Sequence, residues 1–156
     1  MALSVIILFY AGIGLLAAAG SIFISQKVFF AKGQQIFFAL FFVAIAGFYL
    51  AFTAYFGDQE AWRLEMRAVI LFAVFGILGL RLPFALIVGY SLHGVWDVVH
   101  EIHAHSGVSP LGAQEMTELP LGYGAFCAAF DWCIATYVYA KRREWSAAWS
   151  GSSTSA

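Results

Sequence analysis

The chain has 156 residues, of which 62% are hydrophobic and 11% charged, with a net charge of −1 and a mean hydropathy of +0.83. A soluble domain usually carries about 25% charged residues, so this composition argues against a water-soluble fold. The near-neutral charge gives no reason to expect nucleic acid as a partner. We therefore expect an all-α membrane protein.

The first apolar run, residues 2–25, predicts a transmembrane helix that is retained in the mature protein. No basic segment precedes it, and it exceeds the roughly 7–15 apolar residues of a signal-peptide core. A polar turn is expected to follow, from Gln26-Lys27 to Gly33-Gln34-Gln35.

Four further apolar segments predict helices at residues 36–56, 62–80, 84–103 and 120–140, which gives a polytopic membrane helix bundle of five transmembrane helices. A span needs about 20 residues. The apolar part of the third segment is shorter, so Glu65 and Arg67 are expected inside the bundle. Residues 1–145 would form a single transmembrane helical domain and residues 146–156 a disordered tail.

Lysine and arginine are distributed unevenly between the two expected sides of the membrane. One side holds Lys27, Lys32, Arg81, Lys141, Arg142 and Arg143. The other holds the acids Asp58, Glu60, Glu115 and Glu118 with the basic Arg63 and Arg67. Because cytoplasmic loops carry an excess of basic residues, we predict that the N-terminus lies outside and the C-terminus in the cytoplasm.

All four histidines of the chain lie in residues 91–105, a segment that starts within the fourth expected helix. Ionisable residues within a membrane span are costly, so several on one segment indicate a functional site. His93, Asp97 and His100 follow an i, i+4, i+7 spacing, which places them on one stripe of the helix. Glu101 lies beside that stripe.

Side chains from other helices are expected to meet this stripe. With about 1.5 Å of helix rise per residue, His93 and Asp131 lie at similar depth in the membrane. Tyr49 reaches about the same height, and Glu65 descends towards the level of His100. The spacing therefore predicts that these residues converge within the bundle.

Imidazole and carboxylate groups from facing helices are how helix bundles build metal sites. This donor set suits zinc, iron or manganese. The predicted metal ligands are His93, Asp97, His100 and Glu101. Asp131 or Glu65 would complete the ligand shell or act as general base, and Tyr49 would stabilise a developing negative charge. A plain hydrogen bond between Asp131 and His93 remains an equal alternative.

Two sequence motifs contain most of these residues. The first reads His-x-x-Trp-Asp-x-x-His at residues 93–100, and the second reads Cys-Ala-x-x-Asp at residues 127–131. Together they resemble a family of small uncharacterised bacterial integral membrane proteins with a His-x-x-Trp-Asp-x-x-His-His motif and a Cys-Ala-x-Cys-Asp helix. Here Glu101 replaces the last histidine of that family's motif and Phe130 its second cysteine. The resemblance implies a bacterial cytoplasmic (inner) membrane protein and names no activity.

Three functions remain open on the sequence alone. The first is a metal-dependent enzyme acting on a hydrophobic or lipid-like substrate that enters from the membrane lipid. The second is a structural or accessory subunit of a homo-oligomer or a larger membrane complex. The third is a proton or ion pathway along the acids and histidines, which ranks last because the cytoplasmic half holds few ionisable residues. Haem ligation by His93 is a further possibility.

Overall fold

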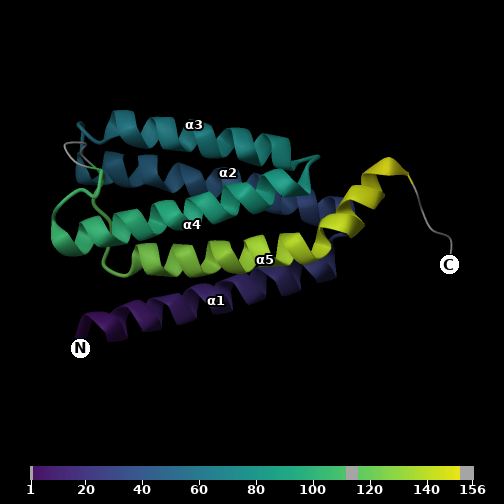
Figure 1. Ribbon diagram of the computed structural model, residues 1–156, viewed down its shortest axis with the longest axis horizontal. Helices are drawn as coiled ribbons and strands as arrows, with labels where there is room; N and C mark the ends of the chain where they lie inside the picture. The colour runs from purple at the N-terminus through teal and green to yellow at the C-terminus, as the bar shows by residue number, and fades with distance from the viewer. Residues whose placement is uncertain (1, 112–115, 152–156) are drawn as a thin grey trace.

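The computed structural model describes residues 2–111 and 116–151. Within these ranges it contains five helices and no strand, which confirms the all-α prediction. The helices are α1 (Ala2–Val28), α2 (Ala31–Phe56), α3 (Trp62–Gly79), α4 (Pro83–Ser106) and α5 (Tyr123–Ser150). Figure 1 shows them lying side by side, with successive helices running in opposite directions.

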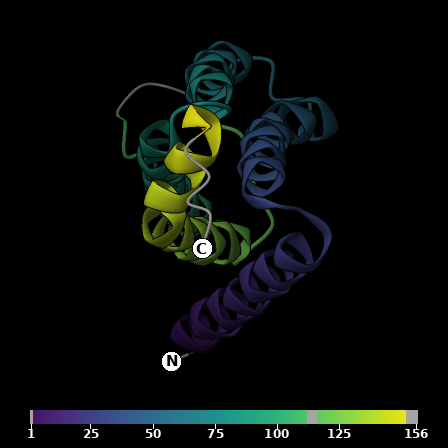
Figure 2. The same ribbon diagram turned by 90° about the vertical axis from the view of Figure 1, so that its right-hand side faces the viewer.

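Helices α4 and α5 form the closest pair in the bundle. The α2–α3 hairpin packs against this pair, and α1 lies along α5 on the other side (Figures 1 and 2). Helix α1 makes few contacts with its chain neighbour α2. The two N-terminal helices are therefore held apart by the rest of the bundle, which leaves room between them.

The helix ends carry the residues expected at such positions. Pro83 occupies the first turn of α4, where a missing backbone N–H costs nothing. Gly57 and Gly107 follow α2 and α4 with φ angles of 75° and 65°. A left-handed residue after the last helical turn favours glycine because it has no Cβ to clash.

Helix α2 begins at Ala31, five residues before the expected start at residue 36. The predicted polar turn is therefore wrong: α1 continues to Val28, so only Phe29 and Phe30 lie between the two helices. Gln34 and Gln35 are helical and buried. The Gln35 amide Nε2 donates a hydrogen bond to the Gly79 carbonyl at 2.8 Å. Such a partner on α3 satisfies the buried amide, and the sequence alone gives no sign of it.

Helix α5 continues through the basic residues 141–143 to Ser150, ten residues beyond the expected end at 140. Its last turns lean across the end of the bundle (Figure 1). Trp145 is fully buried, and Trp149 Nε1 donates to Gln35 Oε1 at 2.9 Å. Residues 146–150 are thus helical where a disordered tail was expected, and residues 152–156 lie outside the described part of the chain.

The interior divides into two parts. An apolar half, at the end where α5 finishes, consists of fully buried side chains: Phe38, Leu86, Ile134, Val138 and Trp145. A polar half contains the predicted site residues: Tyr49, Glu65, His93, Asp97, His100 and Asp131, each at most 2% exposed. Both halves are shielded from bulk solvent, so each polar group in the second half needs a hydrogen-bond partner or a ligand.

By length and composition, α1 and α2 can cross a membrane, with mean hydropathies of 2.3 and 2.4 over their most apolar windows. Among the described helices these two alone meet that criterion. Helices α3, α4 and α5 carry Glu65, Asp97 and Asp131, which lower their mean hydropathy. Glu65 is buried as expected. The prediction that Arg67 lies inside the bundle is wrong, because Arg67 is exposed.

Candidate metal centre

Three buried side chains meet where α4 crosses α5. His93 Nδ1 lies 2.6 Å from Asp131 Oδ2 and 3.3 Å from Asp97 Oδ2. His93 and Asp97 lie one turn apart on α4, and Asp131 comes from α5. The structure therefore confirms that His93 of the histidine stripe meets Asp131 of the fifth helix.

Close packing and a hydrogen bond fix the Asp97 carboxylate. A Cβ atom at Gly124 would overlap the backbone carbonyl oxygen of Asp97, so glycine at this position lets α5 approach α4 beside the site. The Tyr49 hydroxyl of α2 donates to Asp97 Oδ1. The other carboxylate oxygen, Oδ2, is thereby left facing His93.

The donor atoms of His93, Asp97 and Asp131 lie within 4.8 Å of one another. Two ligands of one zinc ion, with bonds of about 2.0–2.2 Å, lie no more than about 4.4 Å apart, and the 3.3 Å from His93 Nδ1 to Asp97 Oδ2 falls within that limit. The 2.6 Å from His93 Nδ1 to Asp131 Oδ2 is a direct hydrogen bond, which confirms the alternative that the sequence left open for this pair. Two carboxylates and a neutral imidazole would also balance the charge of a divalent ion in a buried site. The three residues can therefore hold a metal ion.

Several polar atoms of this cluster accept or donate no hydrogen bond within residues 2–111 and 116–151: His93 Nε2, Asp97 Oδ2 and Asp131 Oδ1. Buried polar atoms without a partner are rare and call for a specific explanation. His93 and Asp131 also line a cavity of about 280 Å³ that lies between α1, α2 and α5. The cluster thus has unused donor and acceptor atoms beside an open space.

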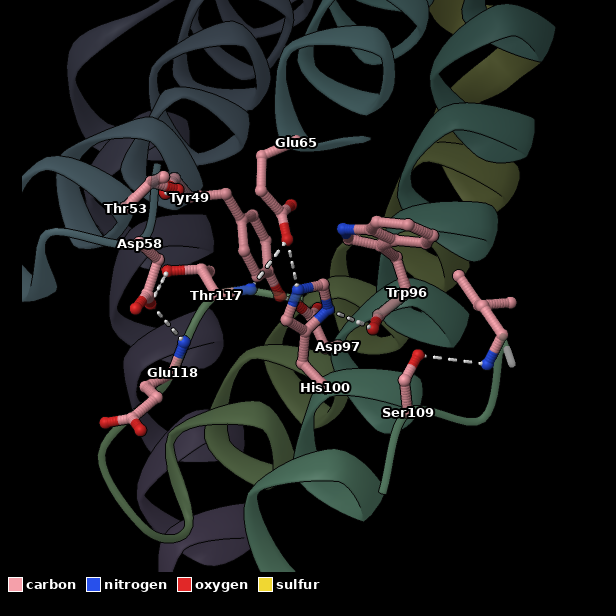
Figure 3. Close-up of polar contacts among 11 residues, drawn as sticks. Tyr49, Thr53, Asp58, Glu65, Trp96, Asp97, His100, Ser109, Thr117 and Glu118 are labelled. Atoms are coloured by element: carbon pink, nitrogen blue, oxygen red, sulfur yellow. Dashed lines mark hydrogen bonds and ion pairs between the residues drawn. The ribbon is translucent and has the colours of Figure 1, made fainter. Parts of the chain in front are cut away.

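His100 and Glu65 form a separate pair, shown in Figure 3. His100 Nε2 lies 2.8 Å from Glu65 Oε1, and His100 Nδ1 donates to the Trp96 carbonyl at 3.1 Å. With Nδ1 committed to a carbonyl, one proton must be shared between Nε2 and the carboxyl group. Glu65 Oε1 also accepts from the Thr117 backbone N–H at 3.2 Å, so the pair joins α3, α4 and the α4–α5 loop.

Glu101 lies in a third environment. Its carboxylate accepts hydrogen bonds from the backbone N–H groups of Gly122, at 3.0 Å, and Ala125, at 3.2 Å. His105 Nε2 lies 2.7 Å from the same carboxylate. The first backbone N–H groups of a helix have no partner within it, so Glu101 stabilises the start of α5.

The four predicted metal ligands therefore do not lie around one common site. Among the described residues, His93 and Asp97 join Asp131 in the metal-compatible cluster, whereas His100 and Glu101 bind other partners. Tyr49 touches both regions, because its hydroxyl binds Asp97 and its ring lies 4.4 Å from the His100 ring. Helical spacing places residues on one stripe but does not show which acid each one faces.

Two residues that support the site were not identified from the sequence. Asp58, counted there only for its charge, accepts hydrogen bonds from Thr117 Oγ1 and the Glu118 backbone N–H, which anchors the α4–α5 loop (Figure 3). Thr117 in turn supplies the N–H that binds Glu65. Neither residue lies in a recognisable motif, so no sequence signal would have found them.

The fold and the site define an all-α protein, with five helices in its described residues and a buried His–Asp cluster suited to a metal ion. The pattern of the family described as "Family of unknown function (DUF6010)" matches residues 12–144, which is most of the chain. The chain belongs to this family, in agreement with the resemblance to an uncharacterised family. No curated protein and no solved structure matches it.

Proposed function

We propose that the protein is an integral membrane protein whose five helices all cross the bilayer, with the N-terminus outside. The distribution of its side chains supports this: Leu16, Ile77 and Phe84 are 74%, 62% and 72% exposed, whereas Glu65, Asp97 and Asp131 are fully buried. A soluble protein would place these groups the other way round. A bilayer accepts an apolar exterior, and it requires ionisable groups to face the bundle interior.

Within that membrane bundle, we propose a metal-dependent enzyme that acts on a hydrophobic substrate. The observation that carries the proposal is the convergence of donor atoms of His93, Asp97 and Asp131 within 4.8 Å of one another, beside a cavity that His93 and Asp131 line. Catalytic metal sites typically use three protein ligands and leave one position for water or substrate. The cavity beside His93 and Asp131 gives such a position access to a substrate.

The residues of the cluster would have distinct roles. His93, Asp97 and Asp131 would hold zinc, iron or manganese, and the ion would act as a Lewis acid or activate a bound water. Tyr49 would orient Asp97 through its hydrogen bond and, because it also lines the cavity, present a hydroxyl near the substrate. Glu65, first considered as a general base, would instead position α3 through His100.

A non-catalytic accessory subunit is the second candidate, favoured by the Glu65–His100 pair. This pair and the Asp58–Thr117 contact tie three segments together without using the cavity. A bundle that is locked in this way could serve as the membrane anchor of a larger complex. The two candidates differ in one property, which is a stoichiometric metal ion.

A proton or ion pathway remains third. The apolar half packs Phe38, Leu86, Ile134 and Val138 between the cluster and the far end of the bundle. A continuous relay would need polar groups or water through this layer. The packing therefore favours a site that is confined to one half of the bundle over a path across the membrane.

Elemental analysis of the full chain in lipid nanodiscs tests the enzyme proposal. We expect about one zinc, iron or manganese atom per chain, since the three ligands form one site. The variant Asp131→Asn should lose the metal, whereas Glu60→Gln, a change at an exposed acid, should retain it. Metal-free protein that copurifies with other subunits would contradict the proposal and support the accessory role. A Soret absorption band would contradict it too, because it would indicate that His93 binds haem.

A further inference from the structure

The cavity between α1, α2 and α5 combines a few polar side chains with a mostly apolar lining. His93, Tyr49 and Asp131 carry its polar groups beside the cluster, and Ser21, Tyr123 and Cys127 add further polar atoms. Helices α1 and α2 supply apolar side chains such as Ala17 and Phe48. Ligand sites in proteins commonly combine an apolar wall with a few polar groups that orient the ligand. This lining therefore suits a molecule with one polar end and one hydrocarbon part.

The charge of the lining restricts the polar end of that molecule. No lysine or arginine occurs among the described residues that line the cavity, and Asp131 is an acid. A phosphate or carboxylate head would meet Asp131, with Asp97 just behind it. Two carboxylates with one divalent ion are neutral overall, so an uncharged hydroxyl or carbonyl head fits better than an anionic one.

A separate cavity of about 430 Å³ provides the contrast. It lies at the start of α4 and is lined by Arg142 and Arg143 together with Pro83. Anionic lipid head groups are attracted to basic residues of this kind at a membrane surface. The molecule thus keeps its basic side chains away from the cavity beside His93.

Volume and access restrict the hydrocarbon part. At about 280 Å³ the cavity lies just below the 300–1,000 Å³ typical of small-molecule sites, which leaves room for one chain rather than two. Helix α1 barely touches α2, Ala17 and Ser21 are half-buried, and Phe48 is 50% exposed. The cavity therefore opens sideways, towards the surface where lipid chains would lie.

We propose that this cavity binds a neutral single-chain amphiphile, such as a long-chain alcohol or carbonyl compound, with its head at His93 and Asp131. The chain lies between α1 and α2. This inference rests on the proposed function for the membrane setting, and it names the substrate class of the same site. It does not depend on which metal the cluster holds.

Photolabelling tests the proposal directly. The full chain in nanodiscs is irradiated with dodecanol that carries a diazirine on its chain, and the labelled residues are mapped by mass spectrometry. We expect label on the cavity residues Ala17, Ser21 and Phe48. Unlabelled dodecanol at about ten times its dissociation constant should reduce that label roughly tenfold, and dodecyl phosphate should not.

Matched variants on α1 separate the cavity from the general lipid surface. Ala17→Phe fills the cavity and should reduce the label on Phe48 severalfold, and the milder Ser21→Leu should reduce it to a smaller extent. Ala19→Phe changes an exposed residue outside the lining and should leave the label unchanged. The milder variant keeps the test valid if the phenylalanine variant does not fold.

Two results would overturn the inference. One is label spread over lipid-facing residues such as Leu16 and Leu40 without competition by dodecanol. The other is equal competition by dodecyl phosphate, which would show that an anionic head is accepted. Metal content is measured on the same samples. If metal-free protein is labelled and dodecanol competes, the amphiphile site is supported and the metal-dependent enzyme is contradicted. If the protein holds metal but dodecanol does not compete, the metal site is supported and the amphiphile site is contradicted.

Discussion

His93 and His100 lie two turns apart on one face of α4, yet their surroundings differ. Each imidazole meets an acid from a neighbouring helix, at 2.6 Å for Asp131 and 2.8 Å for Glu65. His100 has both ring nitrogens engaged, whereas His93 Nε2 has no partner in the described part of the chain. His93 also lines a cavity, which His100 does not.

The difference shows how similar residue pairs can serve different purposes. A buried group whose hydrogen-bonding capacity is met contributes to the position of its helices. A buried group with unused capacity beside a cavity is a candidate for binding. Glu65 Oε2 also has no partner in the described part of the chain, but both nitrogens of His100 are engaged and neither member of this pair lines the cavity. We therefore assign positioning to the His100–Glu65 pair and ligand binding to the His93 cluster.

The largest expected effect comes from breaking the positioning pair. Glu65→Ala leaves His100 Nε2 buried without a partner and also removes the acceptor of the Thr117 N–H. Breaking a buried ion pair by removing one partner costs about 3–5 kcal/mol. We expect a loss of that order in the free energy of unfolding, measured by denaturant titration in mixed micelles.

Two measurements control this prediction. Glu60→Ala, at an exposed position, should change stability by less than about 0.5 kcal/mol. The refolded Glu65→Ala protein should still bind metal at low temperature. Loss of metal with unchanged stability would reverse the roles assigned to the two regions.

The next largest effect concerns the group that orients the cluster. Tyr49→Phe keeps the ring against His100 but removes the hydroxyl that donates to Asp97. Loss of such a supporting hydrogen bond typically lowers metal affinity about 10–100-fold, and we expect a change in this range by competition with a chelator. Tyr55→Phe, at an exposed position of the same helix, should have no effect. Unchanged affinity in Tyr49→Phe would remove Tyr49 from the site.

A smaller effect is expected at Glu101, which the structure assigns to the start of α5. Glu101→Gln removes the charge that faces the backbone N–H groups of Gly122 and Ala125. Loss of a helix N-terminal cap costs about 0.5–2 kcal/mol, so we expect a modest fall in stability with full metal content. The exposed Glu144→Gln serves as the matched control. A Glu101→Gln protein that loses its metal would restore Glu101 as a ligand.

The sequence was sufficient to locate the five helices of the described chain and to bring the site residues to one level of the bundle. Apolar runs separated by polar breaks located all five helices, and residue spacing placed His93, Asp131 and Tyr49 at one level. The end of α5 could not be predicted, because the basic residues 141–143 resemble a membrane boundary. What extends the helix is the packing of Trp145 on Phe38 and the hydrogen bond from Trp149 to Gln35.

The division of the site could not be predicted either. One side of α4 carries His93, Asp97, His100 and Glu101. Their spacing does not reveal how the neighbouring helices are turned about their own axes, so it does not show which acid faces which histidine. Packing decides that Asp131 faces His93, that Glu65 faces His100, and that Glu101 reaches the start of α5. Gly124 contributes to this decision, because it sets how closely α5 approaches α4.

The most direct test of the central claim compares metal binding by His93→Ala and His100→Ala, each in nanodiscs and at a temperature where both remain folded. After equilibrium dialysis against zinc, iron(II) and manganese(II) in turn, we predict that His100→Ala retains about one ion per chain and that His93→Ala retains none. Loss of the ion from both variants, or from His100→Ala alone, would contradict the separation of a binding region around His93 from a positioning region around His100.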